Sequence, residues 1–380
     1  MEKLLDLEEL GGRLQRVDLM IMMLLKRRID LAHLVARYKI KNGQKFIRLE
    51  IENERLNEVG DWAKKNGLDP NFARQMLYAA ISESCKQQLV DLESRADASG
   101  QTETMTEEEE YLRLKQNLMR LTDAWAPKYD AEYDRPFFAT RTYLEYERVV
   151  LDKEISLLRE RDRAVDLGCA TGRLTFQFAD RFYQTVGYDL SQAMVERATT
   201  KLDERGTPTG LISFRQADLE NGIPENDCSV SLVVMNMGTG SDVRNIANVI
   251  KESGRILKPG GRFFFSFYNR DALVYQWDFL PWPTGLAANI DIHAHCLNVS
   301  MDDSVLPIYA RPYAVEEAVN LFADSGLKIL SATTYPAISS VLPSEFMEKQ
   351  PSVQRSIVAI EKQLIDSGLG AYIIITGCKE

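Results

Sequence analysis

The sequence is poor in the residues that build metal centres and disulfide frameworks. Its 380 residues include five cysteines and three histidines. The cysteines show neither a paired metal-binding spacing nor the density of a disulfide scaffold, and they stand at Cys85, Cys169, Cys228, Cys296 and Cys378. This usage is typical of a reducing cytoplasm. We therefore expect a cytoplasmic protein with no metal site.

Long apolar runs, sequence repeats and excess positive charge are also missing. No stretch is apolar over the length needed to span a bilayer, and the opening residues MEKLLDLEEL are too acidic for a signal peptide. A net charge of −10 argues against a general attraction to nucleic acid. These absences leave a small molecule as the expected partner, with no nucleic acid and no membrane.

Apolar residues make up 45% and charged residues 27% of the chain, which is typical of globular proteins. A chain of 380 residues is longer than a single hydrophobic core usually supports, so more than one domain is expected. The patterning predicts a helical domain over 1–95, linker and lid helices over 96–142, and a doubly wound α/β domain over 143–380. The fold class is therefore α + α/β, with three helices preceding a Rossmann-like domain.

The first predicted helix, about 7–41, has an apolar heptad seam and then two cations on its inward face. The seam has the spacing 4-3-4-3 and consists of Leu10, Leu14, Val17, Ile21 and Leu24. Arg28 takes the next seam position, and Lys39 lies eleven residues later, about three turns on. A helix this long predicts a dimer, and inward cations require an anionic partner.

Two further helices are predicted, over about 51–66 and from Pro70 onward with Asp69 as N-cap. The apolar row of the third helix continues as Ser84 and Gln88. Two interpretations are open for these polar intrusions. Arg28 pairs with Glu52 or Glu54 in a structural salt bridge, or the polar groups converge on a bound anion.

Residues 8–92 resemble the all-helical chorismate mutases, through LLKRRIDLAHLVARYK, GLDP and SESCKQQ. The resemblance implies that Arg28 holds a carboxylate of chorismate and that Lys39 and Gln88 flank the ether oxygen of the breaking bond. Glu52 would meet the substrate hydroxyl, with Ser84 in the same site. Catalysis would be electrostatic, without a covalent step.

This sequence departs from the family pattern at three positions. Gly11 and Ile51 stand where the family has arginines, and Arg48 stands where it has an acidic residue. The helical domain is therefore an active mutase, a site for a related small acid, or only a dimerisation module.

The connecting segment is acidic and polar over 96–110. Thr106 and Glu109 form a capping-box pattern that predicts a helix to about residue 126. The aromatic run WAPKYDAEYDRPFF follows, and it is either a packing strap or a lid over a nucleotide pocket.

From about Tyr143 the chain alternates between strand-like and helix-like segments. The predicted strands are Arg163–Leu167, Gln184–Asp189, Leu211–Gln216, Ser229–Met235, Arg262–Tyr268, Leu327–Thr334 and Ala371–Cys378.

The stretch AVDLGCATGRL over 164–174 reads as a strand, a glycine turn and a helix start. It lacks the middle glycine of a dinucleotide fingerprint and the lysine of a P-loop. A nucleoside without a pyrophosphate fits it better. Asp189, Asp218 and Asn236 each follow a predicted strand, at the edge where open α/β sheets bind ligands.

Residues 125–380 resemble the class I S-adenosylmethionine-dependent methyltransferases, through DLGCATGRL, VGYDLS, QADLE and LKPGGRFFFSF. The resemblance implies S-adenosylmethionine as cofactor. It places the amino acid part at Gly168, Ala170 and Gly172, the ribose at Asp189, the adenine at Leu190, Met194, Asp218 and Leu219, and a lid at Tyr129 and Tyr133.

The methyl acceptor is expected at the segment 269–312 and the strand before it. Candidate substrate residues are Tyr268, His293, His295, Tyr309 and Arg311. The two histidines have a metal or base role, or make ordinary loop hydrogen bonds. The expected function is methylation of a small metabolite. Alternatives are a bifunctional mutase and methyltransferase, another alkyl transfer, and a helical domain that only senses a ligand or dimerises.

Overall fold

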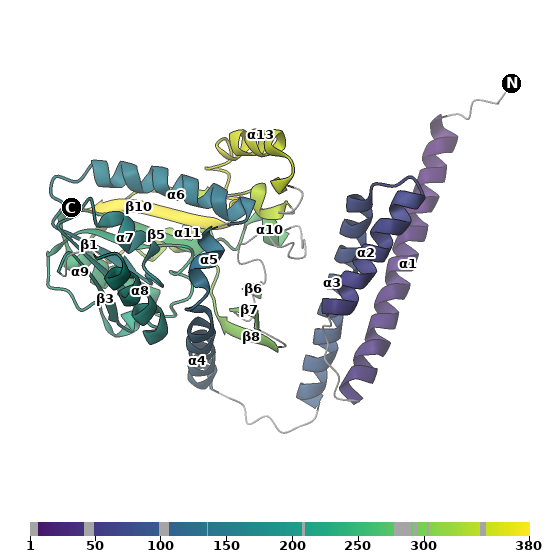
Figure 1. Ribbon diagram of the computed structural model, residues 1–380, viewed down its shortest axis with the longest axis horizontal. Helices are drawn as coiled ribbons and strands as arrows, with labels where there is room; N and C mark the ends of the chain where they lie inside the picture. The colour runs from purple at the N-terminus through teal and green to yellow at the C-terminus, as the bar shows by residue number, and fades with distance from the viewer. Residues whose placement is uncertain are drawn as a thin grey trace. The chain divides into compact units, whose positions relative to one another are not determined.

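A computed structural model describes residues 7–41, 49–98, 106–134, 136–206, 210–276, 290–291, 295–301, 304–342 and 347–380. The chain forms two compact units, 1–105 and 106–380. Figure 1 shows the helices of the first unit and the sheet of the second. The expected fold class is confirmed: helices α1 to α3 are followed by a mostly parallel sheet with flanking helices. Within the described ranges, no helix has the length and apolarity of a membrane span.

The first unit consists of α1 (Leu7–Lys41), α2 (Leu49–Lys65) and α3 (Pro70–Ala98). Asp69 begins α3 as expected, because its carboxylate accepts the Asn71 N–H at 2.7 Å. Small residues let α1 pack closely: Ala32 and Ala36, one turn apart, are buried. The part of α1 before residue 25 has almost no buried surface, and Figure 1 shows it running beyond α2 and α3.

The second unit is built on a sheet of order β3-β2-β1-β4-β5-β10-β9, in which β10 is antiparallel to both neighbours. The strands are β1 (Arg163–Leu167), β2 (Gln184–Asp189), β3 (Ile212–Gln216), β4 (Val230–Met235), β5 (Leu257–Tyr268), β9 (Leu327–Tyr335) and β10 (Tyr372–Lys379). All seven coincide with the predicted strands to within a few residues. Continuous burial of β1 and β4 follows from cover on both faces.

Helices cover both faces of this sheet. The described helices are α4 (Glu107–Trp125), α5 (Tyr129–Asp134), α6 (Phe138–Ser156), α7 (Arg173–Phe178), α8 (Gln192–Glu204), α9 (Ile246–Ile256), α10 (Leu273–Gln276), α11 (Val315–Asn320), α13 (Pro351–Glu361) and the 3₁₀ turns η1 (Leu219–Asn221) and η2 (Ser339–Val341). One apolar cluster joins α6 and α7 to the sheet, and a second joins α9 and α11 to its other face.

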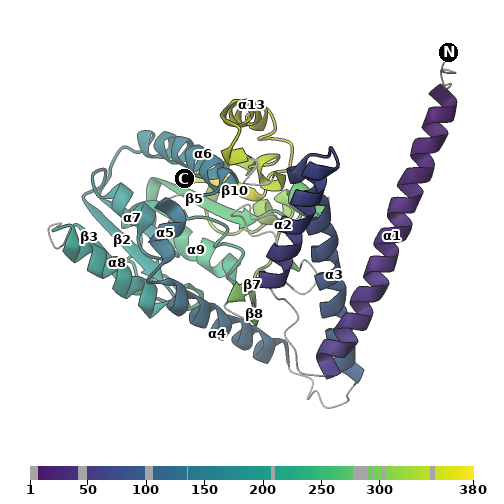
Figure 2. The same ribbon diagram turned by 45° about the vertical axis from the view of Figure 1, so that its right-hand side comes forward.

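A second, three-stranded sheet was not predicted. It consists of β6 (Ile290–Asp291), β7 (Cys296–Met301) and β8 (Ser304–Tyr309), within the segment expected to bind the acceptor. Helix α4 packs on β8: Asn117 donates to the Pro307 carbonyl at 2.8 Å, and Tyr111 meets Tyr309 edge-on at 5.2 Å between ring centroids. Figure 2 shows β7 and β8 beside α4.

Candidate functional site

The glycine loop between β1 and α7 has a strained backbone that only small residues fit. Gly168, Ala170 and Gly172 have φ values of 75°, 46° and 87°. A Cβ on Gly168 would lie 2.5 Å from the Thr239 methyl group. The loop is tied to β2, because the Gly168 N–H donates to the Tyr188 carbonyl at 2.8 Å. It is thus rigid and closely approached by the turn after β4.

Asp189, at the carboxyl end of β2, holds this loop. Its carboxylate accepts the Ala170 N–H at 2.8 Å and the Ser191 N–H at 2.9 Å. Burial raises its pKa above the usual value, although these backbone hydrogen bonds oppose the shift. Next to it, Leu190 is half-buried and Met194 is fully buried. A carboxylate with two backbone donors retains lone pairs for further donors.

Asp218 lies on the neighbouring strand end and caps η1, where Leu219 is buried. Its carboxylate accepts Lys115 of α4 at 2.8 Å, and Lys115 also pairs with Glu220 at 2.8 Å. The sequence did not reveal Lys115, because its partners lie more than a hundred residues away.

Helix α5 is bound to the glycine loop. Asp130 accepts the Thr171 hydroxyl at 2.7 Å and Lys201 at 2.7 Å. Burial raises the pKa of Asp130, but hydrogen bonds from Lys201 and Thr171 outweigh it and lower that pKa overall. The adjacent Tyr129 is half-buried. The expected lid residue Tyr133 falls in α5, but its side chain lies outside the described set.

Asn236 ends β4 but its amide is engaged inside the protein. It is 6% exposed, accepts the Tyr143 hydroxyl at 2.5 Å and donates to Glu147. Glu147 is also held by both terminal nitrogens of Arg173, at 2.9 and 2.8 Å. This network joins α6, the start of α7 and β4. The Asn236 amide is therefore engaged in hydrogen bonds within the protein.

The structure describes four of the five expected acceptor residues. Tyr268 ends β5, is buried, and has a pKa raised well above its usual value by burial. Tyr309 ends β8, with Arg311 exposed two residues later and its guanidinium 5.0 Å from the Tyr313 ring centroid. His295 is exposed with a φ of 49°. His293 lies outside the described residues.

One buried carboxyl group was not singled out by the sequence analysis. Asp242, in the turn after β4, is half-buried as a residue, but its Oδ1 atom is inaccessible. Among the described residues Oδ1 has no hydrogen-bond partner. Burial raises the pKa of Asp242 to about 8, although a hydrogen bond from Tyr268 opposes the shift. Its only sequence signal was its place after a strand.

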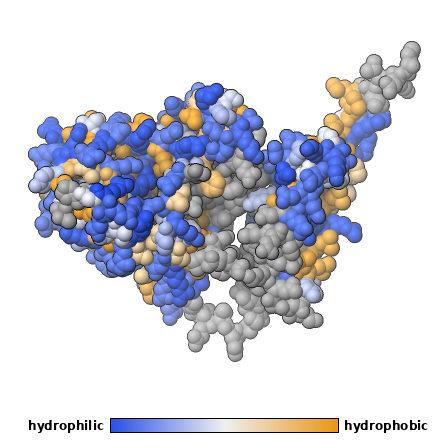
Figure 3. Space-filling model, in the orientation of Figure 1, coloured by the Kyte–Doolittle hydropathy of each residue, from blue (hydrophilic) through white to orange (hydrophobic). Residues whose placement is uncertain are grey.

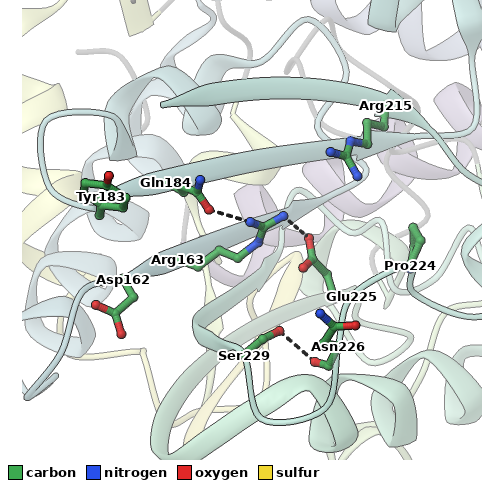
Figure 4. A pocket seen from close by; sticks show the side chains of 9 residues that line it. All are labelled: Asp162, Arg163, Tyr183, Gln184, Arg215, Pro224, Glu225, Asn226 and Ser229. Carbon is green, nitrogen blue, oxygen red and sulfur yellow. Dashed lines mark hydrogen bonds and ion pairs between the residues drawn. The ribbon is translucent and has the colours of Figure 1, made fainter. Parts of the chain in front are cut away.

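A polar hollow of about 390 Å³ opens at the other edge of the sheet, beside the starts of β1, β2 and β4. Figure 4 shows Arg163 lying between Gln184 and Glu225, to which it donates at 2.7 Å each. Because both terminal nitrogens of Arg163 are paired, the hollow has the character of a structural ion-pair network, although the buried Nε atom of Arg163 has no hydrogen-bond partner among the described residues.

In the helical unit, the structure joins two of the expected mutase residues. Arg28 of α1 donates to the Ser84 hydroxyl and the Ala80 carbonyl of α3. Ser84 is 4% exposed and Lys39 is 7% exposed. Glu52 and Gln88 belong to α2 and α3, but their side chains are outside the described set.

Comparisons with known proteins agree with both expected families. Residues 164–261 match the model of a methyltransferase domain, and residues 10–89 match chorismate mutase type II. The ubiquinone biosynthesis O-methyltransferase of Stutzerimonas stutzeri is 31% identical over 127 residues, covering 33% of this chain and 52% of that relative. The ubiquinone/menaquinone biosynthesis C-methyltransferase of Pseudomonas aeruginosa is 29% identical over 150 residues, covering 36% and 56%.

The chain therefore spans about half the length of these curated relatives. Among solved structures, geranyl diphosphate C-methyltransferase from Streptomyces coelicolor has 19% identity and a TM-score of 0.40, covering 62% of this chain and 78% of its own. Likeness at this level does not distinguish one activity from another. The two family matches confirm the expected pairing of a chorismate mutase type II domain with a methyltransferase domain.

Proposed function

We propose that this chain, which joins a chorismate mutase type II domain to a methyltransferase domain, is an S-adenosylmethionine-dependent methyltransferase acting on the hydroxyl group of a small metabolite. The observation that carries the proposal is the hydrogen bond that the Asp189 carboxylate accepts from the Ala170 N–H of the glycine loop. Relatives named as O-methyltransferases, such as that of Stutzerimonas stutzeri, support a hydroxyl acceptor.

The residues present fit this cofactor. The carboxylate of Asp189 retains acceptor capacity for ribose hydroxyls. Buried Met194 and Leu219 offer apolar walls for an adenine, and Asp218 an acceptor at its edge. The glycine loop leaves no side chain at Gly168 or Gly172. When bound, the cofactor supplies an electrophilic methyl group, and the protein's task is to orient the acceptor against it.

Equilibrium titration with S-adenosylmethionine tests the cofactor. Asp189→Ala should weaken binding by about 10- to 100-fold, because hydrogen bonds to a charged group contribute about 1.5–3 kcal/mol. The exposed Asp203 of α8 offers a matched control, and Asp203→Ala should bind as the parent does. No binding by the parent, or equal binding by Asp189→Ala, would contradict the proposal. Labelled cofactor added to a metabolite extract would then identify the acceptor.

A second activity, chorismate mutase, is favoured by two observations: Arg28 of α1 donates to Ser84 of α3, and Lys39 of α1 is buried. Cations fixed inside a helical bundle can stabilise the dianion of a pericyclic transition state. The bifunctional form predicts conversion of chorismate to prephenate, followed by absorbance. Lys39→Ala and Gln88→Ala should each abolish it, whereas the exposed Lys26→Ala should not. Without conversion, the helical domain is a ligand-sensing or dimerisation module.

We also propose that a second copy of this chain covers the exposed seam of α1. Its five apolar residues from Leu10 to Leu24 are between 40% and 67% exposed. Figure 3 shows hydrophobic residues along this helix. A hollow of about 480 Å³ on the same helix is lined by Arg13, Arg16, Val17, Leu19, Met20 and Met23. A heptad seam is self-complementary, so an identical α1 fits it.

A further inference from the structure

Lys115 of α4 is an ammonium group held between two carboxylates at the η1 turn. Its Nζ atom lies 2.8 Å from the Asp218 carboxylate and 2.8 Å from the Glu220 carboxylate. The side chain of Lys115 is 17% exposed, whereas that of Asp218 is 31% exposed. Lys115 is therefore largely enclosed by the protein, while the carboxylate of Asp218 remains accessible to a further molecule.

Glu220 fixes the position of this ammonium group. One of its oxygens, Oε1, accepts the Asn245 N–H at 2.8 Å, and the other, Oε2, accepts the Tyr111 hydroxyl at 2.5 Å. Oε2 is also the atom that accepts Lys115. Burial raises the pKa of Glu220, but hydrogen bonds from Lys115 and Tyr111 outweigh it and lower that pKa overall. Glu220 is thus a charged anchor with partners on both of its oxygens.

The two oxygens of Asp218 are occupied to different extents. A carboxylate oxygen can accept about two hydrogen bonds. Oδ2 accepts Lys115 at 2.8 Å and the side-chain amide of Asn221 at 3.1 Å, which fills it. Oδ1 accepts the Glu220 N–H at 3.3 Å, and this is its one hydrogen bond from the described residues. Oδ1 is therefore the oxygen with room for one further donor.

The charge of Lys115 matters because Asp218 and Glu220 are close in the chain and share this one ammonium group. Two neighbouring carboxylates disfavour each other's ionised form unless a cation lies between them. The ammonium offsets that repulsion, and by binding Oδ2 it keeps the Asp218 carboxylate from turning. Lys115 thus determines which oxygen of Asp218 is presented to a ligand.

We propose that Lys115 is a positioning residue that sets the preference of the cofactor site for adenine. This inference rests on the proposed methyltransferase function, in which Asp218 stands at the edge of the adenine. Lys115 holds Oδ2, and Oδ1 accepts a hydrogen from the exocyclic amino group of the base. A base with a keto oxygen at that position presents a lone pair to Oδ1 instead of a hydrogen, so the site rejects it.

The test is equilibrium titration of the full chain with two probes: S-adenosylmethionine and its inosine analogue, in which a keto oxygen replaces the 6-amino group. The parent should bind S-adenosylmethionine about 10- to 100-fold more tightly, because a hydrogen bond to a charged group distinguishes the two probes. Lys115→Met removes the charge but keeps a long side chain, and its preference should fall below about threefold. Asp218→Asn should lose the preference to the same extent, because an amide can donate as well as accept.

Arg120 offers a matched control, because it is an exposed cation on the same helix. Arg120→Met removes the same charge and should keep the preference of the parent. A double variant, Lys115→Met with Asp218→Asn, separates positioning from a structural role. Because Lys115 acts through Asp218, adding Lys115→Met to Asp218→Asn should change the affinity for either probe by no more than about twofold. Lys115→Ala gives the same measurements if Lys115→Met does not fold.

Three results would overturn the inference. The parent would bind both probes equally, Arg120→Met would lose the preference as fully as Lys115→Met does, or Lys115→Met would weaken both probes in proportion and so keep the parent's preference. The last result would mean that Lys115 only supports the fold. Failure of the parent to bind S-adenosylmethionine is a separate result, because it removes the proposed function itself and this inference with it.

Discussion

Gly168 is a residue at which the backbone and its neighbourhood both demand glycine. Its φ is +75°, and a Cβ would lie 2.5 Å from the Thr239 methyl group. Gly206, after α8, shares a positive φ of +62° but has open space around it. The left-handed conformation costs an L-residue about 1–2 kcal/mol, and the close approach at Gly168 adds about 1–3 kcal/mol of overpacking.

Gly168→Ala should therefore lower the free energy of unfolding more than Gly206→Ala does, by about 1–3 kcal/mol. It should also weaken binding of S-adenosylmethionine, because the turn carrying Thr239 must move from the glycine loop. Urea unfolding and equilibrium titration of both variants measure the two effects. Equal losses in the two variants would show that the backbone strain alone matters.

Single residues were predictable where their role is local. Asp189 follows its strand and bonds to the loop of the preceding strand, a spacing visible in the sequence. Asn236 also follows a strand, but its partners Tyr143 and Glu147 come from a helix about 90 residues earlier. Asp242 depends on Tyr268, at the end of another strand. Side-chain partners of this kind arise from folding and leave no local pattern.

At the scale of elements, the seven strands of the main sheet were predictable because their apolar runs are long and bounded by turns. The hairpin of β7 and β8 was not, although Leu297, Val299 and Met301 alternate with polar residues. It is short, and Pro307 in β8 argues against a strand until β8 is placed at a sheet edge.

Helix α4 shows the same division between local and distant information. Its start was predictable because Thr106 and Glu109 form the capping box that the structure contains. Its task was not. Lys115 spans to Asp218 and Glu220, and Asn117 to Pro307, so α4 joins the expected adenine edge to the acceptor hairpin. The helix thus contacts both regions of the expected site.

At the scale of the whole molecule, the two units are stabilised by different means. The sheet unit has continuous apolar clusters on both faces. In the helical unit, none of the described side chains of α1 before residue 25 is buried, and the buried residues Ala32 and Ala36 lie in its later part. An apolar seam on one helix gains little stability in water without a partner. The exposed seam therefore supports the proposal that a second copy of this chain covers it.

The dimer predicts a mass in solution near twice 43.2 kDa, measured by light scattering after size-exclusion chromatography. Leu14→Glu combined with Ile21→Glu places like charges along both copies of the seam and should give a monomer. Gln15→Glu adds the same charge beside the seam, not on it, and should remain dimeric. A monomeric parent, or a double variant that stays dimeric, would show that α1 is not the interface. Titration with S-adenosylmethionine should be unchanged in all three proteins, because the proposed cofactor residues lie in the other unit, 106–380.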